Sequence, residues 1–567
     1  MVQQANVGVA PNGQPVIILK EGSSQTKGRE AQKNNIMAAK VVSELIRSSL
    51  GPRGMDKMLV DSMGDVTITN DGATILKEID VQHPAAKMMV EVSKTADTEV
   101  GDGTTSVVIL AGSLIEKAEE LIDKEVHPTI VVDGYKKAAK EALRILDEIA
   151  IKVTPGDKKW LKKVAKTSMA SKLIWRESDT LSQIVTDAVV AVADENDGKY
   201  TVDIDDVKVE KKPGESLKDT SLIQGIILDK EVVHAGMPKK IDNAKIALIA
   251  APLEIEKTEF DAKINITNPD QIQAFLDQES TMLKDMVDKI EQSGANVLVC
   301  QKGIDDTAQH YLAKSGILTV RRVKQSDMEK LSRATGARII ANLEDLSKND
   351  LGKSQLVEER KIEEDNWVFV EGCENPRSVT ILIRGGTQRV VDEAERSIHD
   401  SLMVVKDVLV KPSIVVGGGA PEAEISRLLK SYANKLNGRE QLAVQKFAEA
   451  LEIIPITLAE NAGLDPIDTQ VQIAAAHEQG NKWYGVNVVK GQVDDCARLG
   501  IYEPTIVKEQ IIKAATETAG MLLRIDDVVA SSKTPAPPPG ADGGMGGGMG
   551  GMGGMGGMGG MGMPGMM

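Results

Sequence analysis

Residues 100–106 read Val-Gly-Asp-Gly-Thr-Thr-Ser and place one carboxylate, Asp102, in a glycine turn that runs directly into the apolar residues 107–111. Glycines let a backbone approach an anion closely, and the free N–H groups of a first helical turn then point at that anion. Asp102 would repel a phosphate at short range, so the arrangement favours a cation such as Mg²⁺ between the two. The pattern predicts a site for a metal-bound nucleotide. Taken alone it is weak, because Gly-Asp-Gly also forms ordinary turns and Thr-Thr-Ser ordinary helix caps.

Length and composition exclude several classes of protein. The 567 residues are too many for a single core and predict roughly three domains. The formal net charge of −16 argues against a general binder of nucleic acids or anionic membranes, and the chain holds no apolar run of membrane-spanning length. The three cysteines are far apart, so neither a disulfide framework nor a zinc site is expected. With no secretory signal at the N-terminus, a reducing cytoplasm is the expected location.

Apolar periodicity and turn signals divide the chain into helical and mixed parts. Helical patterns cover residues 34–50, about 75–151, 160–196 and 390–405, and strand-like runs occupy 378–383 and 413–416. Between residues 223 and 374, short apolar runs alternate with helical patterns and predict an α/β sheet, with strands at 246–249, 297–299 and 339–341. Residues 58–60 and 66–69 bracket a turn and predict a hairpin. From residue 531 the chain is rich in Pro and then in Gly and Met, which predicts disorder.

Residues 254–290 form a long, mostly polar insertion in the α/β part. The insertion is broken at Asn268-Pro269 and has helical spacing on its C-terminal side. Its scattered apolar residues have no obvious place in a core; they are Phe260, Ile264, Ile266, Ile272 and Phe275. Both a surface helix packed on its own domain and an interaction arm are consistent with this pattern.

Three further features are ambiguous from the residue pattern alone. The turn at residues 417–419 leads into a helix whose first turn holds two acids, which disfavours a phosphate there. This turn fits either close backbone approach to a ribose or base, or a plain connector. Asp71 fits first as a helix cap, and composition predicts Asp400 to be an ordinary exposed acid on a helix.

Six motifs, in order and at family spacing, resemble those of the group II chaperonins, the family of archaeal thermosome subunits and of the eukaryotic cytosolic chaperonin. They are Leu-Gly-Pro-Arg-Gly-Met-Asp-Lys-Met-Leu at 50–59, Thr-Asn-Asp-Gly-Ala-Thr-Ile-Leu at 69–76, His-Pro-Ala-Ala-Lys at 83–87, Gly-Asp-Gly-Thr-Thr at 101–105, Cys-Gln-Lys-Gly-Ile-Asp-Asp at 300–306 and Ala-Glu-Asn-Ala-Gly at 459–463. The likeness runs from about residue 16 to the Gly/Met tail. A single motif of this kind would be weak, but the ordered set is very specific.

The resemblance implies a multidomain fold with nested connectivity. It comprises a mostly α-helical equatorial ATPase domain (1–157 and 412–530), an α+β intermediate domain (158–224 and 376–411), an α/β apical domain (225–375) and a disordered tail (531–567). The insertion at about 254–290 matches a helical protrusion that acts as a built-in lid. Residues 16–19 and 522–529 resemble terminal strands that pair with the hairpin of a neighbouring subunit.

In function, the resemblance implies two stacked rings of eight or nine subunits, of one type or several. The rings would bind non-native client proteins, close on binding and hydrolysis of ATP with Mg²⁺, and promote folding in the chamber. Neither nucleic acid nor a membrane is an expected partner.

The resemblance also assigns residues to the nucleotide position by position. Leu50, Gly51 and Pro52 would line the nucleotide, Gly103, Thr104, Thr105 and Ser106 would hold its phosphates, and Asp102 would bind Mg²⁺. Gly418 would face the ribose and Glu503 the ribose or base, although an exposed helix-capping acid remains an alternative for Glu503.

The remaining assignments concern the chemical step. Asp71 would lie near the γ-phosphate, and Asp400, on another domain, would orient the attacking water once that domain moves inward. Thr167, Ser168 and Lys172 match a nucleotide-sensing loop, with Lys172 as the γ-phosphate contact. This loop lacks the glycine expected from relatives, which weakens its assignment.

Two other functions use the same motifs. A small-molecule phosphotransferase would need an acceptor pocket and no ring, so a monomeric or dimeric mass would favour it. A passive holdase or structural ring would retain the motifs without turnover, and an ATPase assay separates it from an active chaperonin.

Overall fold

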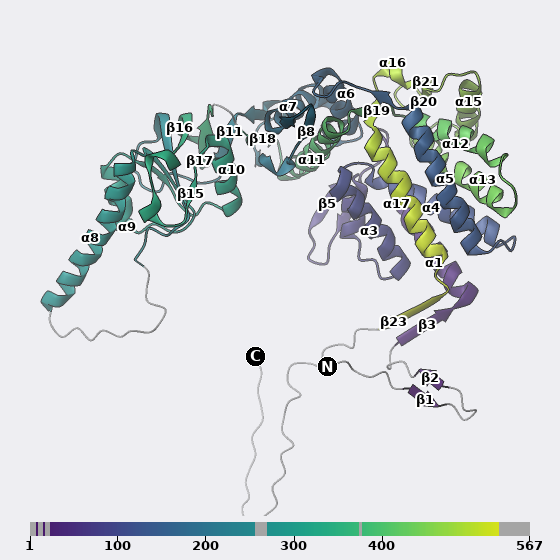
Figure 1. Ribbon diagram of the computed structural model, residues 1–567, viewed down its shortest axis with the longest axis horizontal. Coiled ribbons are helices and arrows are strands. Elements are labelled where there is room, and N and C mark those ends of the chain that lie inside the picture. Colours follow the sequence, from purple (N-terminus) through teal and green to yellow (C-terminus); the bar gives the residue numbers. More distant parts are fainter. Residues whose placement is uncertain (1–6, 10–14, 18–22, 256–268, 374–376, 532–567) are drawn as a thin grey trace, which may run out of the picture. The chain divides into compact units, whose positions relative to one another are not determined.

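The computed structural model describes residues 7–9, 15–17, 23–255, 269–373 and 377–531 (Figure 1). Contacts divide the chain into two units, one of residues 1–31 with 526–567 and one of residues 32–525. In the smaller unit, β1 (Val7–Val9) pairs with β2 (Pro15–Ile17), and β3 (Ser23–Lys27) pairs with β23 (Asp527–Ser531), both antiparallel. No helix in these described residues is long and apolar enough to cross a membrane.

The terminal strands differ from their predictions. Val16 and Ile17 were expected to lack a partner in their own chain, but they pair with β1; residues 18–19 lie outside the described residues. Of residues 522–529, only the end from Asp527 is a strand, because Leu522 and Leu523 are buried in the last turn of α17. The partner strand β3 reads Ser-Ser-Gln-Thr-Lys, which has no apolar pattern to announce it.

A helical body makes up the first and last parts of the larger unit (Figure 1). As far as Ile115, its helix α4 is apolar nearly all round and almost entirely buried, as expected for a central helix. The helices are α1 (Gly28–Arg47), α2 (Gly72–Glu78), α3 (Pro84–Val100), α4 (Thr104–Ile122), α5 (Pro128–Ile149), α12 (Ala420–Ala433), α13 (Arg439–Leu451), α14 (Ile453–Asn461), α15 (Pro466–Glu478), α16 (Cys496–Leu499) and α17 (Thr505–Leu523).

Short strands connect these helices. The predicted hairpin is confirmed as β4 (Lys57–Val60) and β5 (Val66–Thr69), and a second hairpin joins β20 (Tyr484–Asn487) to β21 (Gln492–Asp495). A three-stranded antiparallel sheet places β19 (Ser413–Val416) between β6 (Ile151–Lys152) and β22 (Tyr502–Pro504). The turn at residues 417–419 therefore starts beside β22.

A mixed layer of helices and strands lies in the sequence between the first and last parts of the helical body. Its three-stranded sheet has the order β10 (Ser221–Ile223), β18 (Val379–Gly385), β9 (Val207–Pro213). One apolar core joins this sheet to the helices α6 (Lys158–Met169), α7 (Ser178–Val192) and α11 (Gln388–Val410). The layer also contains the short helices η1 (Leu173–Glu177), η2 (Ile204–Asp206) and η3 (Leu217–Asp219).

The helical pattern predicted from residue 160 to about 196 differs from the structure in two places. Helix α6 ends at Met169, and residues 170–172 form a turn before η1 and α7. Residues 194–196 form β7 (Asp194–Asn196), a hairpin strand with β8 (Lys199–Thr201). The hairpin turn contains Asp197 and Gly198, both with positive φ, and this Asp-Gly signal was overlooked.

The third part is the predicted α/β sheet, with seven strands. They are β11 (Gly225–Leu228), β12 (Lys240–Ile249), β13 (Val297–Cys300), β14 (Leu318–Val320), β15 (Ile339–Ile340), β16 (Gly352–Ile362) and β17 (Asp365–Glu371). Alternate residues of β12 and β13 face two apolar cores, so α8 (Pro269–Ser293) and α9 (Asp306–Lys314) cover one face and α10 (Gln325–Thr335) the other (Figure 1). Two short helices, η4 (Leu343–Asp345) and η5 (Lys348–Asp350), precede β16.

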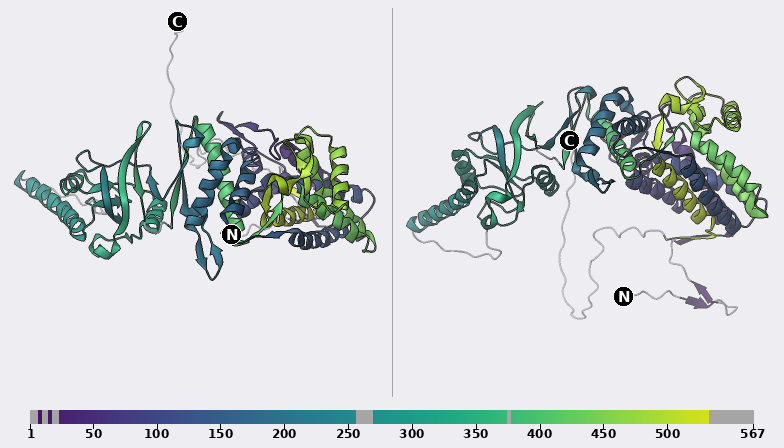
Figure 2. Two further views of the ribbon diagram at one scale, coloured as in Figure 1. Left: turned by 90° about the horizontal axis from the view of Figure 1, so that it is seen from above. Right: turned by 45° about the horizontal axis from the view of Figure 1, so that its top comes forward.

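Helix α8 confirms the helical spacing predicted for the C-terminal side of the insertion. Its C-terminal half packs on the sheet through Leu283, Val287 and Ile290, while residues 273–279 are exposed and the helix runs on beyond the sheet (Figure 2). Phe275 is among the exposed residues. Phe260, Ile264 and Ile266 lie outside the described residues. The fold is thus multidomain and combines helices with sheets.

Candidate functional site

The glycine turn between α3 and α4 forms an open helix N-terminus. Gly101 and Gly103 have φ of 64° and 77°, a region that favours glycine. Asp102 Oδ1 accepts a hydrogen bond from the Gly103 N–H at 2.6 Å. No side chain caps α4, and its first turn from Thr104 contains no acid. The first N–H groups of α4 are therefore free to bind an anion, as the sequence predicted.

Asp71 is the N-cap of α2 and also reaches the glycine turn. Its Oδ2 accepts a hydrogen bond from the Thr74 N–H at 2.8 Å, and its Oδ1 accepts one from the Thr104 hydroxyl at 2.9 Å. Burial favours the neutral carboxyl, but the charge of Lys172 and these hydrogen bonds outweigh it and lower the pKa of Asp71. The cap and the candidate site are therefore one and the same feature.

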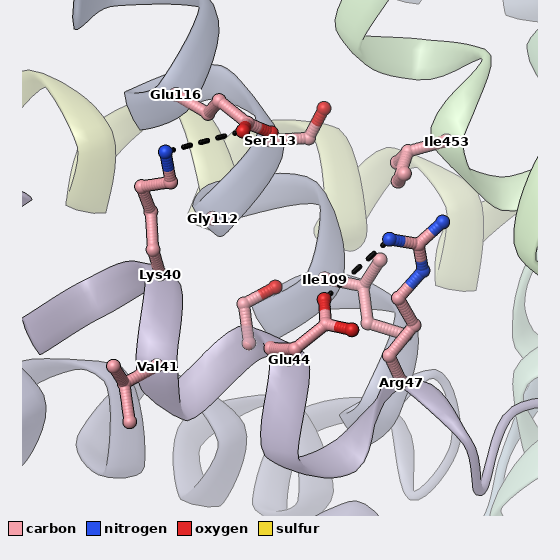
Figure 3. A pocket seen from close by; sticks show the side chains of 10 residues that line it. Lys40, Val41, Glu44, Arg47, Ile109, Gly112, Ser113, Glu116 and Ile453 are labelled. Carbon is pink, nitrogen blue, oxygen red and sulfur yellow. Dashed lines mark hydrogen bonds and ion pairs between the residues drawn. The ribbon is translucent and has the colours of Figure 1, made fainter. Parts of the chain in front are cut away.

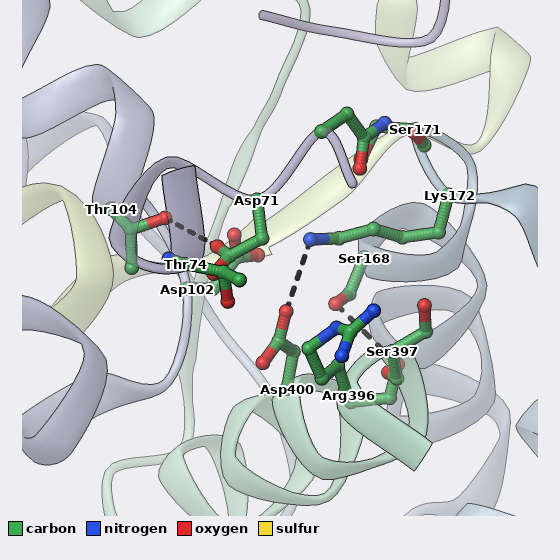
Figure 4. A network of polar contacts seen from close by, with 12 residues as sticks. Asp71, Thr74, Asp102, Thr104, Ser168, Ser171, Lys172, Arg396, Ser397 and Asp400 are labelled. Carbon is green, nitrogen blue, oxygen red and sulfur yellow. Dashed lines mark hydrogen bonds and ion pairs between the residues drawn. The ribbon is translucent and has the colours of Figure 1, made fainter. Parts of the chain in front are cut away.

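Asp400 meets Lys172 in a buried ion pair. Lys172 Nζ lies 3.1 Å from Asp400 Oδ2, and each side chain is 9% exposed. Figure 4 shows the two side chains pointing toward each other, with Asp71 and Thr104 nearby. The expectation from composition that Asp400 is an ordinary exposed acid is wrong, because α11 buries this side of its surface against the turn that follows α6.

Lys172 faces three carboxylates at once. Although burial opposes its charge, Asp400, Asp71 and Asp102 together raise the pKa of Lys172 above its usual range. A single lysine cannot neutralise all three acids, so burial still raises the pKa of Asp400 and that of Asp102. The site carries an excess of negative charge that a bound cation would relieve.

The loop with Lys172 is tied to its surroundings by polar contacts. The Thr167 hydroxyl accepts a hydrogen bond from the Tyr502 N–H at 3.1 Å, and the Ser168 hydroxyl accepts one from Ser401 at 3.4 Å. The Asn70 side-chain amide donates to the Ser171 carbonyl. These contacts position Lys172. The Thr167 hydroxyl also donates to the Lys163 carbonyl at 3.1 Å, so it is fully engaged with the protein.

The turn from Leu50 to Pro52 is held by a different residue. The Asn461 side-chain amide donates to the carbonyls of Arg47 and Leu50, at 3.1 and 2.9 Å. Gly51 has φ of 80°, and a Cβ at that position would lie 2.4 Å from Leu458 Cδ2. Two motifs that the sequence singled out separately thus meet here: the motif at 459–463 holds the turn that begins the motif at 50–59.

Gly418 and Glu503 lie at the sheet formed by β6, β19 and β22, Gly418 in the turn after β19 and Glu503 in β22. Gly417 follows β19, and its N–H donates to the Ile501 carbonyl just before β22, the strand that carries Glu503. Glu503 forms an ion pair with Lys508 of α17, at 2.6 Å. Sequence reasoning missed Lys508, because α17 also carries the exposed Lys513 and nothing in the local pattern tells the two lysines apart.

The residues present fit a magnesium ion that arrives with a nucleotide. Mg²⁺ is commonly held by one or two carboxylates together with phosphate oxygens and water. Asp102 supplies one carboxylate next to the free N–H groups of α4. In the described ranges, no group of three or more His, Cys, Asp or Glu side chains could hold a metal by itself.

A separate cavity of about 260 Å³ lies between α1, α4 and α14 and is lined by none of the predicted site residues (Figure 3). Its charged groups already pair with protein: Lys40 with Glu116 at 3.2 Å and Arg47 with Glu44 at 3.5 Å. It therefore offers no spare cation for a phosphate.

Known proteins match this sequence along nearly the whole chain. The model of the TCP-1/cpn60 chaperonin family matches residues 42–533. A thermosome subunit of Pyrococcus horikoshii is 57% identical over 532 residues, which cover 94% of this chain and 97% of the relative. The thermosome subunits beta and alpha of Archaeoglobus fulgidus are 57% and 56% identical over 519 residues, which cover 92% of this chain and 95% of each relative.

Proposed function

Because the chain belongs to the TCP-1/cpn60 chaperonin family, as a group II chaperonin subunit, we propose that it hydrolyses ATP to drive folding of other proteins in a ring assembly. The observation that carries the ATPase part is the convergence of Asp71, Asp102 and Asp400 beside the uncapped N-terminus of α4. Asp400 is distant in the sequence from the other two acids, and it meets them through Lys172.

Each residue has a role that follows from its position. The N–H groups of Thr104, Thr105 and Ser106 bind phosphate oxygens, and Asp102 holds Mg²⁺, which would offset the negative charge of the phosphates. Asp71 is held ionised by its hydrogen bonds and lies next to Thr104. It therefore keeps a fixed negative charge beside the metal-bound phosphates.

Asp400 is the proposed acceptor that orients the attacking water. Its carboxylate is held by Lys172, and the Asp400 Cα lies 3.8 Å from where a Cβ on Gly101 would be, so this part of α11 lies against the glycine turn. Binding of a nucleotide adds phosphate oxygens that compete for the same lysine. We propose that Lys172 then shifts toward the γ-phosphate and frees Asp400 for the water, so that hydrolysis depends on the position of α11.

The test is turnover after Asp400→Ala, with Glu395→Ala as the matched control on the same helix. Glu395 is partly exposed and pairs with Lys211, away from the glycine turn. Asp400→Ala should bind ATP but hydrolyse it at least ~100-fold more slowly, as removal of a group that positions the nucleophile does. Near-normal hydrolysis would refute the assignment of Asp400.

For the assembly, we propose two stacked rings with a built-in lid at about 254–290 that encloses non-native proteins. The support on this chain is α8, whose described N-terminal half exposes Phe275 and Leu276 while its C-terminal half is anchored on the sheet. Leu283, Val287 and Ile290 belong to the core of the sheet, so the test removes only residues 256–279. This deletion should leave hydrolysis largely intact and abolish protection of a captive protein from protease. Retained protection would contradict the lid.

Native mass spectrometry of the purified protein tests the ring itself. It would distinguish eight from nine subunits per ring and one subunit type from several. A monomeric or dimeric mass would refute the ring and favour a small-molecule phosphotransferase.

A further inference from the structure

A buried lysine joins two carboxylates beside the turn at residues 417–419. Lys508 Nζ lies 2.8 Å from Glu422 Oε1 and 2.6 Å from Glu503 Oε2. The side chains of Lys508 and Glu422 are only 7% and 9% exposed, whereas that of Glu503 is 24% exposed. Glu422 therefore anchors the lysine, and Glu503 is the member of the group that a ligand can reach.

The second oxygen of Glu503 lies directly on the glycine turn. A Cβ at Gly417 would sit 2.3 Å from Glu503 Oε1, so the missing side chain at this position is what lets the carboxylate pack there. Strand pairing places Glu503 opposite Val415, two residues before the turn. One carboxylate oxygen is thus fixed by Lys508, and the other is presented at the backbone of Gly417.

Helix α17 connects this group to the phosphate-binding turn. A Cβ at Gly103 would lie 2.7 Å from Ile511 Cδ1 and 3.1 Å from Val507 Cγ1, so α17 packs against that glycine through residues on both sides of Lys508. Lys508 also acts electrostatically on Asp102. Helix α17 therefore helps to set the distance between Asp102, at the phosphate-binding turn, and Glu503, at the turn of residues 417–419.

We propose that Lys508 is a positioning residue for the sugar: it holds the Glu503 carboxylate oriented so that its free oxygen accepts a hydrogen bond from a ribose hydroxyl. The ligand class is a ribonucleoside di- or triphosphate, chosen over its deoxy form. This inference rests on the proposed function, because it needs a nucleotide between the two turns. Lys508 itself touches no substrate and acts only through Glu503.

The test compares binding of ADP, 2′-deoxyADP and 3′-deoxyADP to the assembled protein with Mg²⁺, by isothermal titration calorimetry. Loss of a hydrogen bond to a charged group weakens binding roughly 10- to 150-fold, so the native chain should bind one deoxy form that much less tightly than ADP. Lys508→Met should bring this ratio close to one. Lys513→Met, on the same helix and 50% exposed, should leave the ratio unchanged.

Two further variants keep the inference testable if Lys508→Met fails to fold. Glu422→Leu with Lys508→Met removes the buried pair as a unit, which proteins tolerate better than loss of one partner. Glu503→Ala removes the carboxylate, and with it the acceptor, at a partly exposed position. Both should lose the preference for ribose.

The outcomes separate this inference from the proposed function. If the native chain binds ADP with a clear ribose preference and a folded Lys508 variant or Glu503→Ala keeps it, the role of Lys508 acting through Glu503 is refuted while the proposed function stands. The role is equally refuted if the native chain binds ADP and both deoxy forms alike. If the native chain binds none of these nucleotides, the proposed function fails together with this inference.

Discussion

Replacement of Lys172 by Met should destabilise the protein more than replacement of its partner. The lysine lies 3.1 Å from Asp400 with both side chains 9% exposed, and it also faces Asp71 and Asp102. Its removal leaves a buried carboxylate without a partner, beside two others, and such a loss costs about 3–5 kcal/mol. Asp400→Asn leaves Lys172 with the other two acids, and loss of one charged hydrogen bond costs about 1.5–3 kcal/mol.

The double variant Lys172→Met with Asp400→Asn sharpens this prediction. Because it removes both charges of the pair, it should be more stable than Lys172→Met alone, although it contains one more substitution. Urea unfolding without nucleotide, followed by circular dichroism, gives the order of the midpoints. Lys166→Met is the matched control, since Lys166 is 50% exposed and pairs with the exposed Asp179, so that its loss should cost less than about 1 kcal/mol.

Two results would refute the reasoning about Lys172. The first is a midpoint for Lys172→Met equal to that of Lys166→Met. The second is a double variant less stable than Lys172→Met. Either would mean that Lys172 does not carry the charge balance of the three carboxylates.

Three other predictions concern the surroundings of the site. Burial raises the pKa of Asp407 to about 7, so its contribution to stability is present below pH ~4 and is lost as the pH rises through 7. Asp407→Asn should therefore flatten the fall in stability between pH 4 and 8, by up to about 4 kcal/mol in unfolding free energy, and an unchanged slope of melting temperature against pH would contradict this. Gly101→Ala places a Cβ 2.4 Å from Met403 Cβ at a φ of 64°, so ATP hydrolysis should fall more than ATP affinity. Met403→Gly removes the clashing Cβ and should restore part of the hydrolysis, whereas equal losses of hydrolysis and affinity in Gly101→Ala would argue against a link to α11. Asp71→Ala should lower stability by about 1–2 kcal/mol because it removes the N-cap of α2, whereas Asp71→Asn should cost less because an amide oxygen can still accept from the Thr74 N–H. Equal melting temperatures for the two variants would count against the cap.

The local features of the site could be predicted from the sequence because they depend on neighbouring residues. The glycine turn at Gly101 and Gly103, the cap at Asp71 and the hairpin at residues 57–69 all follow from turn and capping chemistry within a few positions. In each case the residue type itself decides the local structure: glycine can adopt positive φ because it lacks a Cβ, and an aspartate side chain can cap the helix that follows it.

The long-range features could not be predicted in this way. Periodicity indicates that Asp400 is on a helix, but its burial depends on which helix and loop pack against it, and these come from residues about 230 positions earlier. Lys508 has the same difficulty, since its partners Glu422 and Glu503 are in other elements. The resemblance supplied Asp400 by position, yet it offered no expectation for Lys508.

The shared core of the helical body has a consequence for biosynthesis. Helices α4 and α5 pack with α13 and α17; the ring of Tyr135 meets that of Phe447, and the Ser113 hydroxyl donates to the Ala450 carbonyl. On a ribosome that adds 5–20 residues per second, the early helices wait roughly 15–60 s for these later partners. During that time the growing chain presents bare apolar helices to the cell, so a newly made subunit is itself exposed to aggregation until its last hundred residues emerge.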